Sequence, residues 1–303
     1  MSENSSLLIA RIDNNNACVP IFSRNQDISR AIASVFKIWV LGAVALAVED
    51  GSIASVSNTL PLIADDISPV GATINEEPLG TQFSITDLAA LMMGVSDNTA
   101  TDHLFNFVGR PANEEILDDF NFSNTSVIEP FLTTNEAFHL FFTRPLSEAL
   151  SYASGSETFQ RNYLNNTLDP LGPVTTIPFS NRETLLTTTW QANTMDICNA
   201  IAGLRKFNDL TDAFNLIDQA YGANAGIFNL RNNWERVWFK GGSLFDTTGQ
   251  RSLSGSWLLE SDDRGAFVVV SLNTNDSINL SPIDSGTIFS VLSRVMEIID
   301  ENN

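Results

Sequence analysis

The chain carries Ser34-Val35-Phe36-Lys37 directly before Ile38 to Val48, an apolar run that must be buried in a folded protein. A buried ammonium group is costly unless it is paired or has lost its proton, so a lysine beside this run needs a chemical reason. Only three lysines occur among the 303 residues. Two of them lie in short motifs in which a lysine has a chemical role. Lys37 ends the first motif, and Lys240 begins the second, Lys240-Gly241-Gly242-Ser243.

Ser34 and Lys37 lie one turn apart on a helix that the small and apolar residues predict over 31–49. A serine hydroxyl is a weak nucleophile until a neighbouring base removes its proton, and a lysine neutralised by burial can be that base. A chance Ser/Lys pair on a helix is the simpler explanation when this motif is taken alone.

A third motif, Ser96-Asp97-Asn98, lies between two expected helices, 84–93 and 99–108. A serine in such a loop can pass a proton to a leaving group, and an asparagine amide can hold both a lysine and a substrate carbonyl. The same three residue types are also ordinary in a turn that ends a helix.

The motif at Lys240 follows the strand-like run Val237-Trp238-Phe239. Its glycines allow a substrate to lie against the strand edge, and its lysine offers charge for a substrate carboxylate. A strand ending in a glycine turn with a surface lysine is the alternative. The order of the three motifs, at a helix start, an interhelix loop and a late strand, favours one shared active site over coincidence.

Strands are expected at both ends of the chain and helices in the middle. The strand candidates are 7–13, 17–23, 236–240, 252–260 and 266–273, and the further helix candidates are 114–120, 135–142, 193–207, 210–221 and 284–299. This layout predicts an α/β fold in which helices flank an antiparallel sheet built from both termini, with an all-α domain inserted between its parts. We expect the sheet domain to comprise residues 1–30 and 208–303, and the all-α domain residues 31–207.

The three motifs, together with the stretches 34–45 and 92–104, resemble the class A β-lactamase and penicillin-binding serine hydrolase superfamily. The resemblance is strongest to a branch labelled serine hydrolase. It implies a class A β-lactamase-like fold with the active site in the cleft between the two domains. It also implies an acyl-enzyme mechanism that needs no metal and no cofactor.

The resemblance assigns roles to individual residues. Ser34 is the acylated nucleophile, Lys37 the base or proton relay, and Ser96 the proton donor to the leaving group. Asn98, Lys240, Gly242 and Ser243 bind substrate, and the backbone N–H groups of Ser34 and Ser243 form the oxyanion hole. β-Lactam opening is the leading function. An esterase or peptidase is one alternative, and a penicillin-binding or sensor protein that stays acylated is another.

The chain departs from the family at two places. Gly241 stands where threonine is commoner, and Glu129-Pro130 resembles the family's glutamate-proline pair without the arginine and asparagine that normally flank it. The candidates for the deacylating base are therefore Glu129, Glu136 and Glu183, and the remaining alternative is that the protein has no such base. An insertion of about fifty residues is expected within 130–189.

Arg251 is a further candidate for a substrate carboxylate, with a solvated arginine in a turn as the alternative. Cys18 and Cys198 are interpreted as small buried apolar side chains, although a disulfide between them is also open. Neither these cysteines nor His103 and His139 have the spacing of a metal site.

The formal net charge of −20 argues against nucleic acid and anionic membrane partners. We therefore expect a monomer that acts on a small molecule. No leader peptide is apparent, since the first long apolar stretch begins at Ile38. The resemblance implies a periplasmic or secreted protein, with a cytoplasmic location as the alternative.

Overall fold

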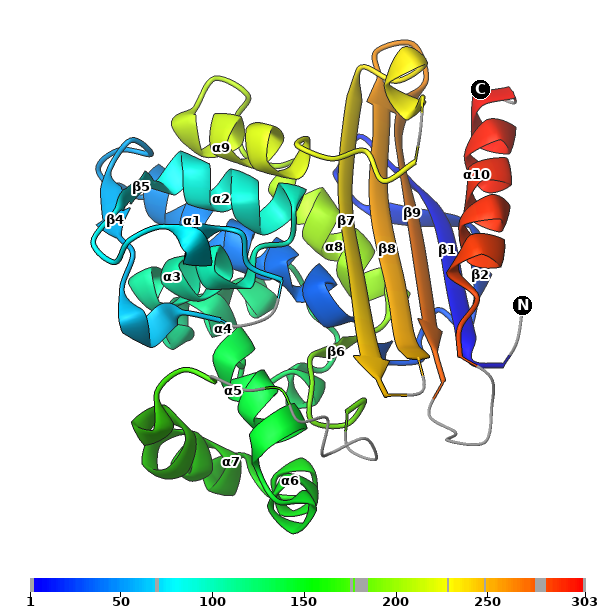
Figure 1. The fold of residues 1–303 in the computed structure, drawn as a ribbon. Helices are drawn as coiled ribbons and strands as arrows, with labels where there is room; N and C mark the ends of the chain where they lie inside the picture. The colour runs from blue at the N-terminus through cyan, green and yellow to red at the C-terminus, as the bar shows by residue number, and fades with distance from the viewer. Residues whose placement is uncertain are drawn as a thin grey trace.

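The computed structural model describes residues 3–68, 71–174, 177, 185–227, 229–247, 249–275 and 282–301. Helices gather on one side of the molecule, and a sheet stands beside them with a single helix on its outer face (Figure 1). Both chain ends lie on the sheet side (Figure 1). The α/β class is therefore confirmed, while the boundaries proposed for the two domains stay a prediction.

The sheet has five antiparallel strands in the order β2-β1-β9-β8-β7. The strands are β1 (Ser5–Ile12), β2 (Cys18–Arg24), β7 (Arg236–Asp246), β8 (Gly249–Ser261) and β9 (Gly265–Thr274). β1 pairs with β9 along its whole length, so the N-terminal hairpin joins the C-terminal strands directly. This pairing confirms a sheet built from both ends of the chain. β7 is longer than expected and contains the whole Lys240 motif.

Each face of the sheet is covered by helices. α10 (Ser285–Glu301) packs on the outer face, where its Leu292 and Met296 join an apolar cluster with Trp257 and Phe267. The inner face packs on the helical part through alternate residues such as Leu258. Residues two apart on a strand point to the same face, and this alternation separates the two apolar clusters.

α1 (Lys37–Glu49) lies at the centre of the helical part and is buried from Lys37 to Ala45. A helix that is apolar all round is stable only when other elements surround it. The helices that pack on it are α2 (Ile85–Gly94), α3 (Asn98–Val108), α4 (Arg110–Asp119), α8 (Thr194–Leu204) and α9 (Asp212–Tyr221). The helical part also contains α5 (Thr134–Phe138), α6 (Leu146–Ala153) and α7 (Glu157–Tyr163).

The helix expected over 31–49 is divided into three parts. β3 (Arg30–Ala31) pairs with β6 (Gln191–Ala192), a short 3-10 turn η1 (Ala33–Phe36) follows, and only then does α1 begin. Ala33 has a φ of 48°, a left-handed conformation that breaks a continuous helix. Apolar periodicity cannot reveal such a break, because both flanking segments are equally buried.

The described part of the segment expected to hold an insertion contains α5, α6 and α7, with a π-helical stretch, His139–Thr143, between the first two. α6 and α7 lie at the lower edge of the helical part (Figure 1). Among the described helices, none is both long and apolar enough to cross a membrane.

Cys18 and Cys198 form a disulfide that joins β2 to α8 across 180 residues of sequence. The interpretation of both cysteines as unpaired apolar side chains was wrong, and the disulfide alternative is confirmed. Each cysteine is consistent with an apolar environment locally. Only the packing of α8 against the N-terminal hairpin brings them together.

We expect the double variant Cys18→Ala/Cys198→Ala to lose about 2–4 kcal/mol of unfolding free energy, because the unfolded chain gains the freedom that the cross-link removes. Urea unfolding of both proteins, with and without reductant, measures the loss. Reductant should lower the stability of the wild-type protein and leave the double variant unchanged. Free thiols titrated in the folded wild-type protein would contradict the disulfide.

Candidate active site

Ser34 lies in η1, on a turn that two contacts fix in place. The Ile32 N–H donates to the Trp190 carbonyl oxygen at 3.0 Å, and the Phe36 ring stacks on Trp190 with 3.8 Å between ring centroids. The first hydrogen bond of the turn runs from the Val35 N–H to the Ile32 carbonyl. The Ser34 N–H precedes that bond and is not used within the turn, and the Ser34 side chain is half-buried.

The Lys37 amine is fully buried and lies against the loop at 96–98. Nζ donates to Asn98 Oδ1 at 2.6 Å, to the Ser96 carbonyl oxygen at 2.7 Å and to Ser96 Oγ at 3.2 Å. Burial holds the pKa of Lys37 well below its ordinary value, and the charge of Lys240 lowers it further, while Asp102 and Asp97 oppose both effects. A neutral amine in this position can accept a proton.

The loop itself is held by Asp97. Its carboxylate accepts from the Ala100 N–H at 2.8 Å and so caps α3, and it also accepts from the Thr73 hydroxyl at 2.9 Å and the Ile74 N–H at 3.2 Å. Ser96 has a φ of 62°, which turns the chain sharply into the helix. The middle residue of the motif therefore fixes the positions of its two neighbours.

Lys240 approaches the same loop from β7. Its Nζ donates to Ser96 Oγ at 2.9 Å and to the Gly241 carbonyl oxygen at 2.9 Å. Burial lowers the pKa of Lys240 to about 7. When Ser96 Oγ accepts a hydrogen bond from Lys240, the hydroxyl proton of Ser96 is free to be donated to a neutral Lys37. Ser96 can therefore pass a proton between the two amines and a bound molecule.

Gly242 allows β7 to lie against η1. A Cβ atom at Gly242 would be 2.5 Å from the Ile32 carbonyl oxygen and 2.8 Å from the Ser34 nitrogen, both of which belong to the backbone and cannot swing aside. A Cβ at Gly241 would meet the Phe239 ring at 2.9 Å, which gives a packing reason for glycine where the family more often has threonine. Ser243 follows on the strand and is exposed.

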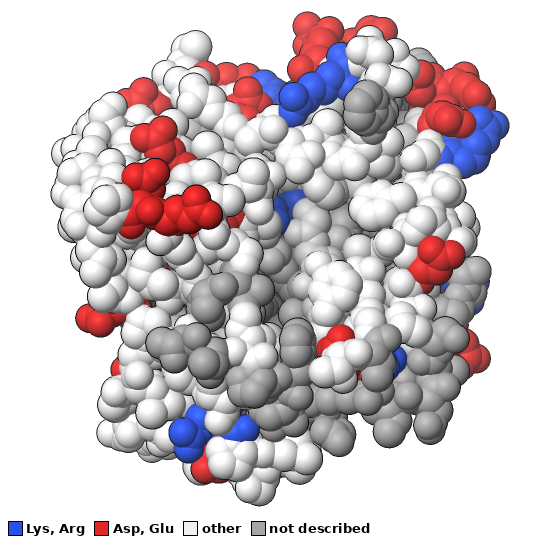
Figure 2. Space-filling model, viewed as in Figure 1, with Lys and Arg blue, Asp and Glu red and all other residues white. Residues whose placement is uncertain are grey.

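Hydrogen bonds thus bring together Lys37, Ser96, Asn98 and Lys240, and Gly242 lies against the backbone nitrogen of Ser34. They come from η1, α1, the loop before α3, and β7. The space-filling view shows a hollow between the helical side and the sheet side, with a basic residue at its floor (Figure 2). The roles of these residues stay predictions.

Two of the candidate glutamates, Glu129 and Glu136, have other partners in the structure. The Glu129 backbone is held by a bond to the Thr125 carbonyl, and the charges that act on the Glu129 carboxyl come from Glu114, Glu157 and Arg161. Burial has the largest effect on the Glu129 carboxyl and raises its pKa, while a hydrogen bond with the Thr125 side chain lowers that pKa by a smaller amount. None of the hydrogen bonds found for the Lys37 amine within the described part of the chain involves Glu129.

Glu136 is also committed to other partners. One of its oxygens pairs with Arg110 at 2.6 Å and the other accepts from the Thr133 N–H at 2.7 Å. Glu183, the third candidate, lies outside the described residues.

Arg251 is buried within β8 and pairs with Asp246 at 2.8 Å, so the alternative of a solvated arginine in a turn was wrong. The next residue, Ser252, donates to the Ala31 carbonyl and therefore faces the helical side. The pairing of β7 with β8 shifts register between Leu244 and Phe245 and skips Arg251, so strand alternation does not assign this side chain a face. None of the hydrogen bonds found for the Lys37 amine in the described part of the chain involves Arg251.

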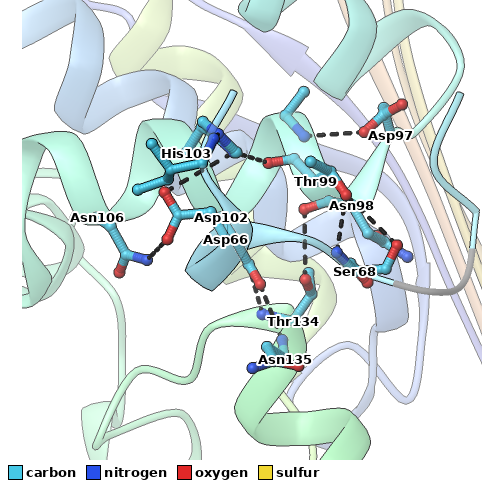
Figure 3. Close-up of polar contacts among 12 residues, drawn as sticks. Asp66, Ser68, Asp97, Asn98, Thr99, Asp102, His103, Asn106, Thr134 and Asn135 are labelled. Atoms are coloured by element: carbon cyan, nitrogen blue, oxygen red, sulfur yellow. Dashed lines mark hydrogen bonds and ion pairs between the residues drawn. The ribbon is translucent and has the colours of Figure 1, made fainter. Parts of the chain in front are cut away.

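Sequence reasoning missed Asp102, which is buried one helical turn after Asn98 on α3. Its carboxylate reaches toward Thr134 and Asn135 at the start of α5 (Figure 3). The four-residue spacing from Asn98 was the available signal, because it puts both side chains on one face of a helix.

The comparisons with known proteins agree with this fold. A sequence model described as the Beta-lactamase enzyme family matches residues 2–163. No curated protein matches the chain at a significant level. A β-lactamase from Chitinophaga pinensis has a similar structure, with a TM-score of 0.66 at 14% identity, covering 99% of this chain and 94% of that chain.

Two further solved structures have the same fold. A class A β-lactamase from Bacteroides cellulosilyticus has a TM-score of 0.63 at 13% identity, covering 98% of this chain and 91% of that chain. A single-residue mutant of PBP-A, an acyl-enzyme complex with penicillin G, has a TM-score of 0.62 at 14% identity, covering 99% and 90%. Identities this low show the fold, whereas the sequence match spans more than half of the 303 residues. The chain therefore belongs to the beta-lactamase enzyme family.

Proposed function

We propose that the protein is a serine hydrolase that forms an acyl-enzyme on Ser34 and acts on β-lactam amides. The observation that carries the proposal is the pair of buried lysine amines that share Ser96 Oγ, with Lys37 at 3.2 Å and Lys240 at 2.9 Å. Two ammonium groups on one hydroxyl oxygen repel each other, so at least one amine is favoured in its neutral form. A neutral Lys37, three residues after Ser34 in the chain, is the base that we assign to this nucleophile.

The reaction follows from the positions of these groups. Lys37 takes the Ser34 hydroxyl proton as Oγ attacks the lactam carbonyl carbon, and the backbone N–H groups of Ser34 and Ser243 stabilise the resulting oxyanion. The C–N bond then breaks while the Ser96 hydroxyl donates its proton to the ring nitrogen. Lys37 returns its proton to Ser96, which leaves an ester on Ser34. Water hydrolyses that ester to release the acid.

β-Lactams are the substrate class to test first. A ring-bound carboxylate would pair with Lys240, the cation that lies beside the strand edge in β7. The PBP-A structure contains penicillin G as an acyl-enzyme, which supports the same class here. The disulfide is consistent with the periplasmic or secreted location that we propose, because such compartments are oxidising.

A second candidate function is acylation without efficient release, as in a penicillin-binding or sensor protein. The observation that favours it is the engagement of two candidate bases elsewhere. The Glu136 carboxylate is held by Arg110 and the Thr133 N–H, and Glu129 lies among charges from α4 and α7. If the protein does hydrolyse its acyl-enzyme, a group other than Glu129 and Glu136 must activate the water.

Penicillin G should add its own mass to the wild-type protein, and Ser34→Ala should show no adduct because the nucleophile is gone. Intact-protein mass spectrometry measures this, with the exposed Ser57→Ala as the matched control that should acylate normally. Nitrocefin turnover separates the two candidates, since a stable adduct without turnover favours the second. An adduct of equal yield on Ser34→Ala would refute the nucleophile.

The rate constant kcat/KM for a carboxylate-bearing substrate should fall as pH rises through about 7, where the pKa of Lys240 lies. Above that pH the free enzyme loses the cation that attracts the carboxylate. Lys240→Arg should remove this alkaline limb, because an arginine stays charged over the whole range. A limb at the same pH in Lys240→Arg would show that another group titrates.

Gly242→Ala should slow acylation by about 100-fold, the loss typical of one displaced oxyanion donor. The added methyl group would push β7 away from Ile32 and Ser34. Stopped-flow measurement of acylation tests this, and Gly286→Ala on α10, where a Cβ meets its nearest neighbour at 3.4 Å, is the control. Equal acylation rates would mean that β7 does not supply the oxyanion site.

A further inference from the structure

Asp102 is a buried carboxylate that caps a helix other than its own. It lies on α3 with 1% of its surface exposed. Its Oδ1 accepts from the Thr134 N–H at 2.7 Å and its Oδ2 from the Asn135 N–H at 2.9 Å (Figure 3). Thr134 and Asn135 begin α5, and the first N–H groups of a helix have no partner within it. One side chain on α3 therefore holds the start of α5.

The same contact reaches the candidate active site within one helical turn. Asn98, four residues before Asp102, gives its Oδ1 to the Lys37 amine at 2.6 Å. The Thr134 hydroxyl donates to the Asn98 carbonyl oxygen at 3.4 Å, so α5 is attached to the first turn of α3 at two levels. A shift of α5 would move the turn that positions the acceptor of Lys37.

Asp102 also borders a cavity. It lines a polar cavity of about 380 Å³ between α3 and the segment that carries α5. Ionisable groups on several elements surround Asp102 or line the same cavity. The acidic groups are Asp65 and Asp66 on the turn η2 (Ala64–Asp66), Asp97 at the start of α3, Glu136 on α5, and Asp169. The basic groups are Lys37 on α1, His103 next to Asp102 on α3, Arg110 on α4, and His139 directly after α5.

Electrostatics couples Asp102 to the base. Burial is the main cause that raises the pKa of Asp102 to about 7, the hydrogen bonds from Thr134 and Asn135 oppose it, and Asp66 raises it further. The negative charge of Asp102 in turn raises the pKa of Lys37. An ionised Asp102 therefore makes Lys37 hold its proton more firmly.

We propose that Asp102 is a positioning residue for acylation, which clamps the start of α5 to α3 and so holds the turn that carries Asn98. The inference rests on the proposed function of Ser34 and Lys37. It assigns Asp102 no contact with substrate. Its effect is the placement of Asn98, whose Oδ1 accepts from the Lys37 amine.

Asp102→Asn tests the clamp while keeping the shape of the side chain. The weakened clamp should slow acylation, because Asn98 is then held less firmly against the Lys37 amine. An asparagine oxygen can accept only one of the two N–H groups well, so hydrogen exchange at the Thr134 and Asn135 amides should accelerate by about 10-fold. The exposed Asp118→Asn on α4 removes one charge far from this contact and should change neither.

Stability gives a readout that does not depend on activity. The folded pKa of Asp102 is about 7 and its ordinary value is 3.8, so between these pH values the folded protein binds a proton that the unfolded chain has lost. The contribution of this group to stability is therefore present below about pH 4 and is lost as pH rises through 7. Asp102→Asn should lack this decline, which urea unfolding across the range measures.

Thr134→Pro keeps every charge and removes one donor of the clamp. Proline is well tolerated as the first residue of a helix, and Thr133 already has the extended backbone (φ −70°, ψ 166°) that a residue before proline needs. It should accelerate exchange at Asn135 and slow acylation. The inference is overturned if the wild-type protein acylates while Asp102→Asn leaves the acylation rate, the exchange and the stability profile unchanged. A wild-type protein that does not acylate at any pH would instead overturn the proposed function.

Discussion

The whole site depends on the burial of one lysine amine. Lys37 begins the most apolar helix of the chain and has none of its surface exposed, yet no carboxylate is among the hydrogen-bond partners found for its amine in the described residues. Its acceptors are neutral oxygens of residues 96–98. Such an environment favours the amine over the ammonium ion, and the other features of the site follow from the need to place this group beside a hydroxyl.

The fold supplies that placement from three separate parts of the chain. α1 brings the amine, the capped start of α3 brings the hydroxyl and amide of the loop, and β7 brings a second lysine and a glycine edge. β1 pairs with β9, β9 pairs with β8, and β8 pairs with β7, the edge strand that carries Lys240. Rigid elements thus meet at one oxygen, Ser96 Oγ, and little rearrangement is needed for proton transfer.

The sequence was informative where function requires particular residue types at short spacing. The three motifs, the sheet from both ends and most helices were predicted, because local periodicity and the resemblance reflect them directly. The break of the first helix at Ala33, the pairing of Arg251 with Asp246, and the disulfide were not. Each of these depends on which surfaces meet after folding, and partners separated by up to 180 residues leave no local pattern.

The protonation state of Lys37 can be measured directly, because the chain has only three lysines. Uniform ¹⁵N-lysine labelling gives three side-chain signals, which Lys206→Arg and Lys240→Arg would assign. The exposed Lys206 serves as the internal reference for a charged ammonium group. Our account predicts that the Lys37 signal has the shift of a neutral amine at neutral pH and becomes an ammonium signal only on acidification. A Lys37 signal that stays that of an ammonium group above neutral pH would contradict it.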